Sequence, residues 1–355
     1  MSFFIPAPKP ATKLGIYRVL SARAGVRVSP LCLGAMSIGD KWEDWMGSMD
    51  KESSFKLLDA YFNLGGNFID TAGNYQDESS EEFIGEWAEK REIRDQLFIA
   101  TKYTTLFKKA DPKIIQKVNY TGNNTKNMHL SVKASLKKLR TDYIDLLYVH
   151  WWDYDTSIEE IMDGLHNLVV QGKVLYLGIS DTPAWVVAQA NQYARDHGKT
   201  PFSIYQGQWN ILQRSFERDI IPMARSFGMA LAPWSVLAGG RLRTDAEEQK
   251  RKEKVAQEVG AKSISSAAIA YVMQKTTHVF PLIGGRKVEQ LEQNLEALDI
   301  TLSSEQIKFL ESQVSFDIGF PTSMIGDGSE PGYLMNIACH YQKIPKAQPL
   351  PAPTL

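Results

Sequence analysis

The chain has 355 residues, of which 43% are apolar, and a formal net charge of −1. This length suits two average domains or one large α/β barrel, each with a substantial core. The balanced charge offers no basic surface for nucleic acid, no apolar run is long enough to span a bilayer, and two cysteines exclude a disulfide framework.

The first thirty residues precede the regular part of the sequence. Residues 1–15 have too few apolar residues, broken by prolines, for the hydrophobic core of a secretion signal, so we expect a cytoplasmic protein. Tyr17–Pro30 then alternates in a strand-like way around Ala24 and Gly25. This alternation predicts a β-hairpin.

From residue 31 onward one theme repeats: a short apolar run, a polar or glycine-bearing turn and an amphipathic helix. The predicted strands are Leu31–Leu33, Asn67–Asp70, Leu97–Thr101, Ile144–His150, Val174–Ile179, Ser203–Gln206, Met229–Pro233 and Val279–Ile283. The predicted helices include Lys51–Leu64, Ser79–Lys90, His129–Arg140, Ile158–Gln171 and Pro183–His197. Strands that alternate with helices are expected to run parallel, because each crossover needs a connection of helix length.

Eight alternations fit either an open doubly wound sheet or a closed barrel. No G-x-G-x-x-G opens a helix after any predicted strand, as it would in a dinucleotide-binding open sheet. Eight is also the number of strands that closes a (β/α)₈ TIM barrel. The sequence therefore favours one barrel domain over residues 1–355, with the hairpin of residues 16–30 at its bottom and residues 316–355 as an irregular tail.

Ionisable residues stand where three consecutive predicted strands end. Asp70 ends the second strand, and Tyr75 follows in its loop (DTAGNY). Lys102 ends the third strand (IATK) and His150 the fourth (LLYVH). Each residue alone is more typical of a turn, a solvated strand end or packing. Because four complementary groups gather on the barrel rim that carries active sites, the pattern favours a catalytic role.

The chemistry of these four side chains fits together. A phenol with a pKa of about 10 is a poor acid at neutral pH. A nearby ammonium lowers that pKa, and a carboxylate keeps the ammonium charged, so we expect Asp70, Lys102 and Tyr75 to act as a relay. His150 would then donate a hydrogen bond to a substrate carbonyl oxygen. Carbonyl reduction also needs a hydride, which no side chain supplies, so a nicotinamide or flavin is implied.

Over about residues 14–315 the chain resembles the aldo-keto reductase family. Asp70, Tyr75, Lys102 and His150 match the family pattern in order and context, and so do the segments GGNFIDTAGNY, LFIATK, IDLLYVHWWD, LGISD and GGRKVEQLEQN. Within the family the chain is most similar to fungal aryl-alcohol dehydrogenases. The resemblance implies the barrel, reversible NADPH-linked reduction of aldehydes or ketones, and no metal. The six histidines also show no close pair at metal-ligand spacing.

The resemblance further places nicotinamide near the barrel centre and adenine beside the eighth strand. Ser180, Asp181 and Gln206 would hold the carboxamide, although many family members carry Asn where Asp181 stands, and Trp234 would stack on the ring. Other cofactor contacts implied by position are Gly34, Met36, Asp70, Ser235, Leu237, Gly239, Gly240, Gly284, Gln290, Gln293 and Asn294. Arg286 can form a fork with a 2′-phosphate, which favours NADPH/NADP+ over the NADH pair.

Tryptophans gather near the predicted strand ends, where six of the eight occur. Trp42, Trp45 and Trp151, with Tyr75, are the expected lining of a pocket for aromatic rings. A benzaldehyde-type substrate is therefore favoured over a linear one. Two alternatives stay open: a ketone reductase of fungal secondary metabolism, and a nucleotide-sensing regulatory subunit with slow turnover. We expect a monomer or weak homo-oligomer, without a nucleic-acid or membrane partner.

Overall fold

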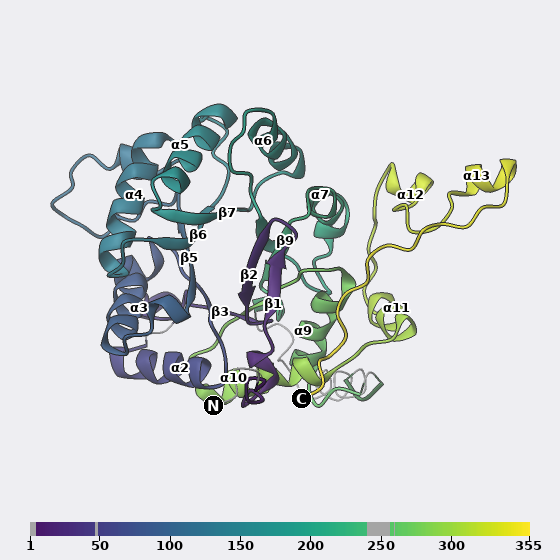
Figure 1. The fold of residues 1–355 in the computed structure, drawn as a ribbon, viewed down its shortest axis with the longest axis horizontal. Helices are drawn as coiled ribbons and strands as arrows, with labels where there is room; N and C mark the ends of the chain where they lie inside the picture. Colours follow the sequence, from purple (N-terminus) through teal and green to yellow (C-terminus); the bar gives the residue numbers. More distant parts are fainter. Residues whose placement is uncertain (1–4, 47–48, 240–255, 259) are drawn as a thin grey trace.

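The computed structural model describes residues 5–46, 49–239, 256–258 and 260–355. A parallel eight-stranded sheet lies at its centre, surrounded by helices (Figure 1). The strands are β3 (Cys32–Gly34), β4 (Phe68–Asp70), β5 (Phe98–Tyr103), β6 (Ile144–Val149), β7 (Val174–Ser180), β8 (Ile204–Gln208), β9 (Ala230–Trp234) and β10 (Leu282–Ile283), in the spatial order β10-β3-β4-β5-β6-β7-β8-β9. All eight predicted strands are confirmed.

The sheet closes on itself between β9 and the residues before β10. Leu231 bridges Val279 in parallel register. The Leu231 N–H donates to the His278 carbonyl at 2.9 Å, and the Phe280 N–H donates to the Leu231 carbonyl at 2.8 Å. This seam makes the sheet a (β/α)₈ barrel and excludes the open doubly wound alternative.

Helices cover the outside of the barrel, and α2, α4, α5, α9 and α11 begin at a capping side chain. They are α2 (Lys51–Asn63), α3 (Ser79–Lys90), α4 (Thr125–Lys138), α5 (Ile158–Val170), α6 (Ala184–Asp196), α7 (Ile220–Phe227), α9 (Ile264–Lys275), α10 (Val288–Leu295) and α11 (Ser304–Ser312), with the short α1 (Glu43–Met46) in the loop after β3. The five predicted helices are confirmed. Helix α4 begins four residues before its predicted start, because the Asn124 side chain accepts the Asn127 N–H and caps it there.

The predicted hairpin consists of β1 (Arg18–Ser21) and β2 (Ala24–Val28). Its turn falls at residues 22–23, two positions before Ala24 and Gly25, because the Ser21 hydroxyl accepts the Arg23 N–H at 3.2 Å and Ala24 turns inward. On its inner face are the buried side chains of Leu20, Ala24 and Val28. They cluster with the first residues of barrel strands, including Phe68 and Phe98. The hairpin therefore closes the amino-terminal end of the barrel.

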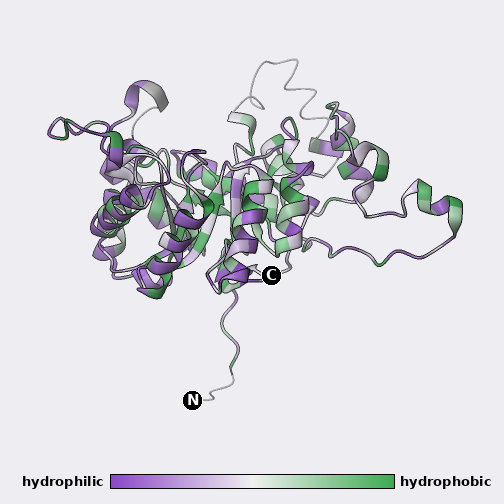
Figure 2. Cartoon of the chain, turned by 90° about the horizontal axis from the view of Figure 1, so that it is seen from above, coloured by the Kyte–Doolittle hydropathy of each residue, from purple (hydrophilic) through white to green (hydrophobic). Residues whose placement is uncertain are grey.

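Beyond α11 the chain forms an extended tail with two short helices, α12 (Thr322–Ile325) and α13 (Tyr333–Ala338). Figures 1 and 2 show it reaching away from the barrel. Near its base the Arg218 guanidinium donates to the Asp317 carbonyl, and near its end the Ala352 N–H donates to the Thr301 hydroxyl at 3.2 Å. Among the described residues, no helix combines the length and apolarity needed to cross a membrane.

Candidate active site

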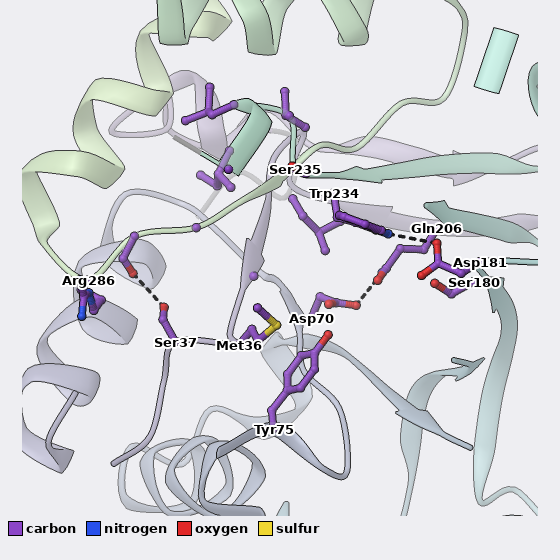
Figure 3. A pocket seen from close by; sticks show the side chains of 18 of the residues that line it. Met36, Ser37, Asp70, Tyr75, Ser180, Asp181, Gln206, Trp234, Ser235 and Arg286 are labelled. Atoms are coloured by element: carbon purple, nitrogen blue, oxygen red, sulfur yellow. Dashed lines mark hydrogen bonds between the residues drawn. The ribbon is translucent and has the colours of Figure 1, made fainter. Parts of the chain in front are cut away.

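A cavity of about 760 Å³ opens at the carboxyl ends of the strands (Figure 3). Its walls come from the loops after seven of the eight barrel strands. The lining residues are Gly34, Met36, Ser37, Trp42, Asp70, Asn74, Tyr75, Thr105, His150, Ser180, Asp181, Gln206, Trp234, Ser235, Val236, Leu237, Gly239, Ile269, Leu282, Ile283, Gly284, Gly285, Arg286 and Gln290.

The four residues predicted to be catalytic lie together: Asp70, Tyr75 and His150 line the floor of this cavity, and Lys102 is buried beneath them. Lys102 Nζ is 2.5 Å from Asp70 Oδ2, 2.8 Å from the Thr71 carbonyl oxygen and 3.4 Å from the Tyr75 hydroxyl oxygen. The side chains of Lys102 and Asp70 are only 0% and 2% exposed. Tyr75 points its hydroxyl toward Asp70 in Figure 3, and its ring centroid is 5.9 Å from that of His150.

Strand periodicity explains why Lys102 lies directly beneath the cavity floor. Alternate residues of a strand face the same side, so Phe98, Ala100 and Lys102 of β5 all point into the barrel. Phe98 and Ala100 fill the interior, and Lys102 stands above them at the rim. The parallel register sets Asp70 of β4 opposite Ala100, one layer from Lys102. The sequence thus brings the ammonium and the carboxylate together through β-strand geometry alone.

Burial controls the acidity of this group of residues. Desolvation alone would lower the pKa of Lys102, but the charge and hydrogen bonds of Asp70 and Tyr75 outweigh it and raise that pKa. Burial raises the pKa of Tyr75 above its ordinary value, and the opposing charge of Lys102 does not cancel this effect. The expectation that the ammonium would lower the phenol pKa is therefore wrong in net direction, because desolvation is larger. Tyr75 keeps its proton at neutral pH.

His150 is a neutral imidazole in this site. Burial, followed by the positive charge of Lys102, lowers the pKa of His150 to about 3. Its Nδ1 atom lies 3.0 Å from the hydroxyl oxygen of Thr105. A neutral ring can present one N–H to a ligand oxygen, so His150 is suited to donate a hydrogen bond.

The loop that carries Tyr75 has an unusual backbone. Gln76, Asp77 and Glu78 are three consecutive non-glycine residues with positive φ, at 52°, 47° and 83°. The left-handed conformation costs an L-residue about 1–2 kcal/mol. Gly39 packs against this loop with φ 131°, and a Cβ there would lie 2.5 Å from the Gln76 Cβ. Such a backbone persists only where the surrounding contacts determine it.

Side-chain hydrogen bonds of Gln76 hold the loop in place. Its Oε1 accepts the N–H groups of Lys41 and Trp42 at 3.1 and 2.9 Å, and its Nε2 donates to the Met36 carbonyl at 3.0 Å. Gln76 is fully buried. The segment from Met36 to Trp42 is therefore tied to the residue next to Tyr75.

A partly buried ion cluster supports the same loop from the other side. The Glu78 carboxylate lies 2.5 Å from Lys108 Nζ and 3.0 Å from Lys138 Nζ. Lys138 also pairs with the buried Glu81 at 2.7 Å and donates to the Gly73 carbonyl at 3.0 Å. These contacts fix both ends of the segment that contains Tyr75.

The residues expected to hold a nicotinamide carboxamide lie side by side in Figure 3. Trp234 Nε1 donates to Asp181 Oδ1 at 3.2 Å, and Gln206 Nε2 donates to Asp70 Oδ1 at 2.8 Å. Asp181 is exposed toward the cavity. Desolvation by the protein around its carboxyl group nevertheless raises the pKa of Asp181 to about 6, against the smaller opposing effects of Trp234 and Lys102.

The far end of the cavity is built around β10 and the start of α10. The exposed Arg286 lies there, beyond Ser37, whose hydroxyl donates to the Gly285 carbonyl at 3.3 Å (Figure 3). Gln290 lines the cavity and accepts the Arg286 N–H at 3.0 Å. Two predicted contacts do not line it: Gln293 is exposed on α10, and Asn294 is buried beneath. Gly240 lies outside the described residues.

The tryptophans divide between the cavity and packing. Trp42 lines the cavity, with its ring edge-on to Tyr75 at a centroid distance of 6.2 Å. Trp151 does not line it; its indole Nε1 donates instead to the Thr105 hydroxyl at 2.9 Å. Trp209 is fully buried and stacks on Phe216. The side chain of Trp45 lies outside the described part of the chain. Among the described tryptophans, Trp42 and Trp234 therefore line the cavity.

Several lining residues were not predicted. They are Ser37, Asn74, Thr105, Val236, Ile269, Leu282, Ile283 and Gly285. Asn74 directly precedes Tyr75, so its adjacency to a predicted catalytic residue was the signal that could have found it. The residues that the structure describes contain no group of three or more His, Cys, Asp or Glu side chains placed to hold a metal ion.

Comparison with known proteins shows which protein family the chain resembles. Residues 30–314 match the model of the aldo/keto reductase family. The chain is 57% identical to an aryl-alcohol dehydrogenase [NADP(+)] of Phanerodontia chrysosporium, over 98% of both chains. It is also 57% identical to a putative aryl-alcohol dehydrogenase of Saccharomyces cerevisiae, over 91% of this chain and 93% of the relative. A norsolorinic acid reductase of Aspergillus flavus is 48% identical, over 97% and 95%.

Proposed function

The chain belongs to the aldo/keto reductase family, and from this premise we propose that it interconverts aromatic aldehydes and aryl alcohols with NADPH/NADP+. The observation that supports the proposal most directly is the buried Asp70–Lys102–Tyr75 contact at the floor of the cavity, with His150 beside it. The nearly full-length similarity to an aryl-alcohol dehydrogenase [NADP(+)] supports the choice of substrate and cofactor.

Each of the four side chains has a distinct role in this proposal. Tyr75 holds a proton at its phenolic oxygen and gives it to the substrate oxygen during reduction. Lys102 stabilises the negative charge that the phenolic oxygen gains, and Asp70 keeps the ammonium in place. His150 donates a hydrogen bond to the substrate oxygen. In alcohol oxidation the same proton returns to Tyr75.

The cavity is suited to nicotinamide adenine dinucleotide phosphate. It runs from the floor at Tyr75 to Arg286, with the flat indole of Trp234 near one end and the glycines that follow β10, Gly284 and Gly285, near the other. A Cβ at Gly239 or Gly284 would meet no atom within 4 Å, so this stretch of wall leaves room for a ligand. When bound, the reduced cofactor would supply the hydride that the side chains cannot.

An assay of NADPH oxidation tests this function. A panel should contain benzaldehyde-type aldehydes, aryl ketones and linear aldehydes of equal carbon number. We expect aromatic aldehydes to show a kcat/KM about tenfold above that of the linear aldehydes, because Trp42 lines the pocket. Equal kcat/KM values for aromatic and linear aldehydes would contradict the proposed aromatic preference. Faster turnover of aryl ketones would favour a ketone reductase instead, an alternative supported by the similarity to norsolorinic acid reductase.

The choice of NADPH over NADH depends on Arg286 in this proposal. Replacing Arg286 with Ala should raise the Kd for NADPH by about tenfold or more, because a charge-assisted pair with the 2′-phosphate is lost. The Kd for NADH should stay nearly unchanged. Titration of cofactor fluorescence measures both constants, and Lys287→Ala, at the neighbouring exposed position, is the control. Equal weakening of both cofactors would refute this role of Arg286.

Asp181 should make the enzyme distinguish oxidised from reduced cofactor in a pH-dependent way. Because its pKa is about 6, the side chain is neutral below that pH and a carboxylate above it. A carboxylate attracts the positively charged NADP+ ring, so the ratio of the Kd of NADP+ to that of NADPH should fall about tenfold as pH rises from about 5 to 8. Both cofactors carry the same phosphates, whose titration cancels in the ratio. In Asp181→Asn the ratio should not change with pH; a parallel fall in that variant would exclude Asp181 as its cause.

A further inference from the structure

Two hydrogen bonds meet at the hydroxyl of Thr105, which lines the cavity beside His150. Thr105 Oγ1 lies 3.0 Å from His150 Nδ1, and it receives the Trp151 indole N–H at 2.9 Å. An indole nitrogen can only donate, so Thr105 is the acceptor in that bond. The direction of the remaining bond decides which ring nitrogen of His150 carries the hydrogen.

Two arrangements of this remaining bond are conceivable. If His150 Nδ1 carried the hydrogen, Thr105 would accept twice, and its own hydrogen would have no partner among the described residues. If Thr105 donates to Nδ1, the hydroxyl accepts once and donates once. The single hydrogen of the neutral imidazole then sits on Nε2, which makes no hydrogen bond within the described part of the chain. Each arrangement leaves one hydrogen without a partner among the described residues, the Thr105 hydroxyl hydrogen in the first and the His150 Nε2 hydrogen in the second. The second is favoured under the proposed function, because a substrate oxygen in the cavity then accepts the hydrogen on Nε2.

The backbone of Thr104 is strained where the chain brings Thr105 to His150. Thr104 has φ 101°, which is rare for a β-branched residue. Its hydroxyl accepts the His150 N–H at 3.3 Å and the Asn123 side-chain amide at 2.9 Å. The chain therefore turns sharply at the end of β5, and this turn brings Thr105 to the His150 ring. Strain of this kind tends to occur at functional sites.

We propose that Thr105 is a positioning residue, oriented by Trp151, that holds His150 as the tautomer with its hydrogen on Nε2. This inference rests on the proposed function, in which His150 donates to the substrate oxygen. The other tautomer would present a lone pair to an oxygen that gains negative charge during reduction. Loss of one such donor in comparable sites lowers turnover by about 10²–10³-fold.

Nitrogen NMR of enzyme with ¹⁵N-labelled histidine tests the tautomer directly. The chain has six histidines, so the His150 signals are those missing from a His150→Gln variant. In the wild type we expect a hydrogen on Nε2 and none on Nδ1. Thr105→Val removes the hydroxyl at constant shape and should give a mixture of tautomers, with kcat/KM reduced about ten- to hundredfold. Thr105→Ser should restore both the signals and the activity.

A second threonine–histidine pair provides a matched control. His166 Nδ1 lies 3.1 Å from the Thr200 hydroxyl and also accepts the Thr200 backbone N–H at 3.2 Å, away from the cavity. Its signals calibrate the Nε2–H form, because Nδ1 must be an acceptor there. Thr200→Val should leave the His150 signals and kcat/KM unchanged.

Three results would overturn the inference: a hydrogen on His150 Nδ1 in the wild type, an unchanged tautomer in Thr105→Val, or a loss of activity there without a tautomer change. None of them depends on the identity of the substrate. Failure of the proposed function has a different signature, because the wild type would then not oxidise NADPH with any aldehyde or ketone, whatever the His150 signals show.

Discussion

Replacing Tyr75 with Phe is expected to lower kcat for aldehyde reduction by about 10²–10⁴-fold, since the variant lacks the proton that the substrate oxygen must receive. The change removes one oxygen atom from a ring that otherwise keeps its edge contacts with Trp42 and His150. Steady-state kinetics with saturating NADPH measures the effect. The Kd for NADPH should remain that of the wild type, because the loss concerns the chemical step.

Tyr193→Phe is the control for this change. Tyr193 lies on α6, and its hydroxyl donates to Asp163 at 3.0 Å, remote from the cavity-lining residues. It should retain wild-type kcat. Because burial raises the pKa of Tyr75, the phenol stays protonated between pH of about 6 and 9, and reduction should show no break from this group in that range. Wild-type turnover by Tyr75→Phe would assign the proton donor elsewhere.

Replacing Lys102 with Met is expected to reduce both stability and catalysis, each for its own reason. The variant leaves the Asp70 carboxylate buried without its ammonium partner, which should cost about 3–5 kcal/mol of unfolding free energy. It also removes the charge that stabilises the phenolic oxygen, so kcat should fall about 10²-fold or more. Denaturant titration and steady-state kinetics on the same preparation separate the two effects.

Two further variants show whether the effects are independent. The double variant Asp70→Leu/Lys102→Met removes both charges and should regain most of the lost stability without regaining activity. Lys138→Met breaks the other buried ion cluster, with Glu78 and Glu81, and should lose comparable stability while kcat falls less than about tenfold. If kcat fell in proportion to the loss of unfolding free energy in Lys102→Met, in the double variant and in Lys138→Met, Lys102 would have no separate catalytic role.

The sequence predicted the barrel and the cluster of four polar residues for one physical reason. Strand periodicity and strand ends are local properties, and parallel closure brings all carboxyl ends to one rim. Asp70, Lys102 and His150 could therefore be placed without knowing any loop. Thr105 could not be placed in this way, because its position depends on the positive φ of Thr104, which the amino-acid sequence does not indicate.

Other differences between the sequence predictions and the structure also arise from the three-dimensional surroundings of the residues. Gln293 and Asn294 are successive residues of the helix that carries Gln290, and the rotation of about 100° between them turns Gln293 to solvent and Asn294 to the core. The net rise of the Tyr75 pKa depends on how completely the cavity floor excludes water, a tertiary property. Trp151 stands next to His150 in the sequence, yet its indole is engaged by Thr105 and does not face the cavity.

The hydrogen bonds of Gln76 have a consequence for changing the substrate range by mutagenesis. Gln76 directly follows Tyr75, and its side chain bonds to the backbone of residues 36–42, so the position of the wall that carries Trp42 is tied to that of the Tyr75 phenol. A library that randomises the wall to admit bulkier rings would displace the acid as well, and most of its members would lose rate instead of gaining scope. Selection for new substrates should therefore leave Gln76 and its hydrogen bonds to the backbone of residues 36–42 intact.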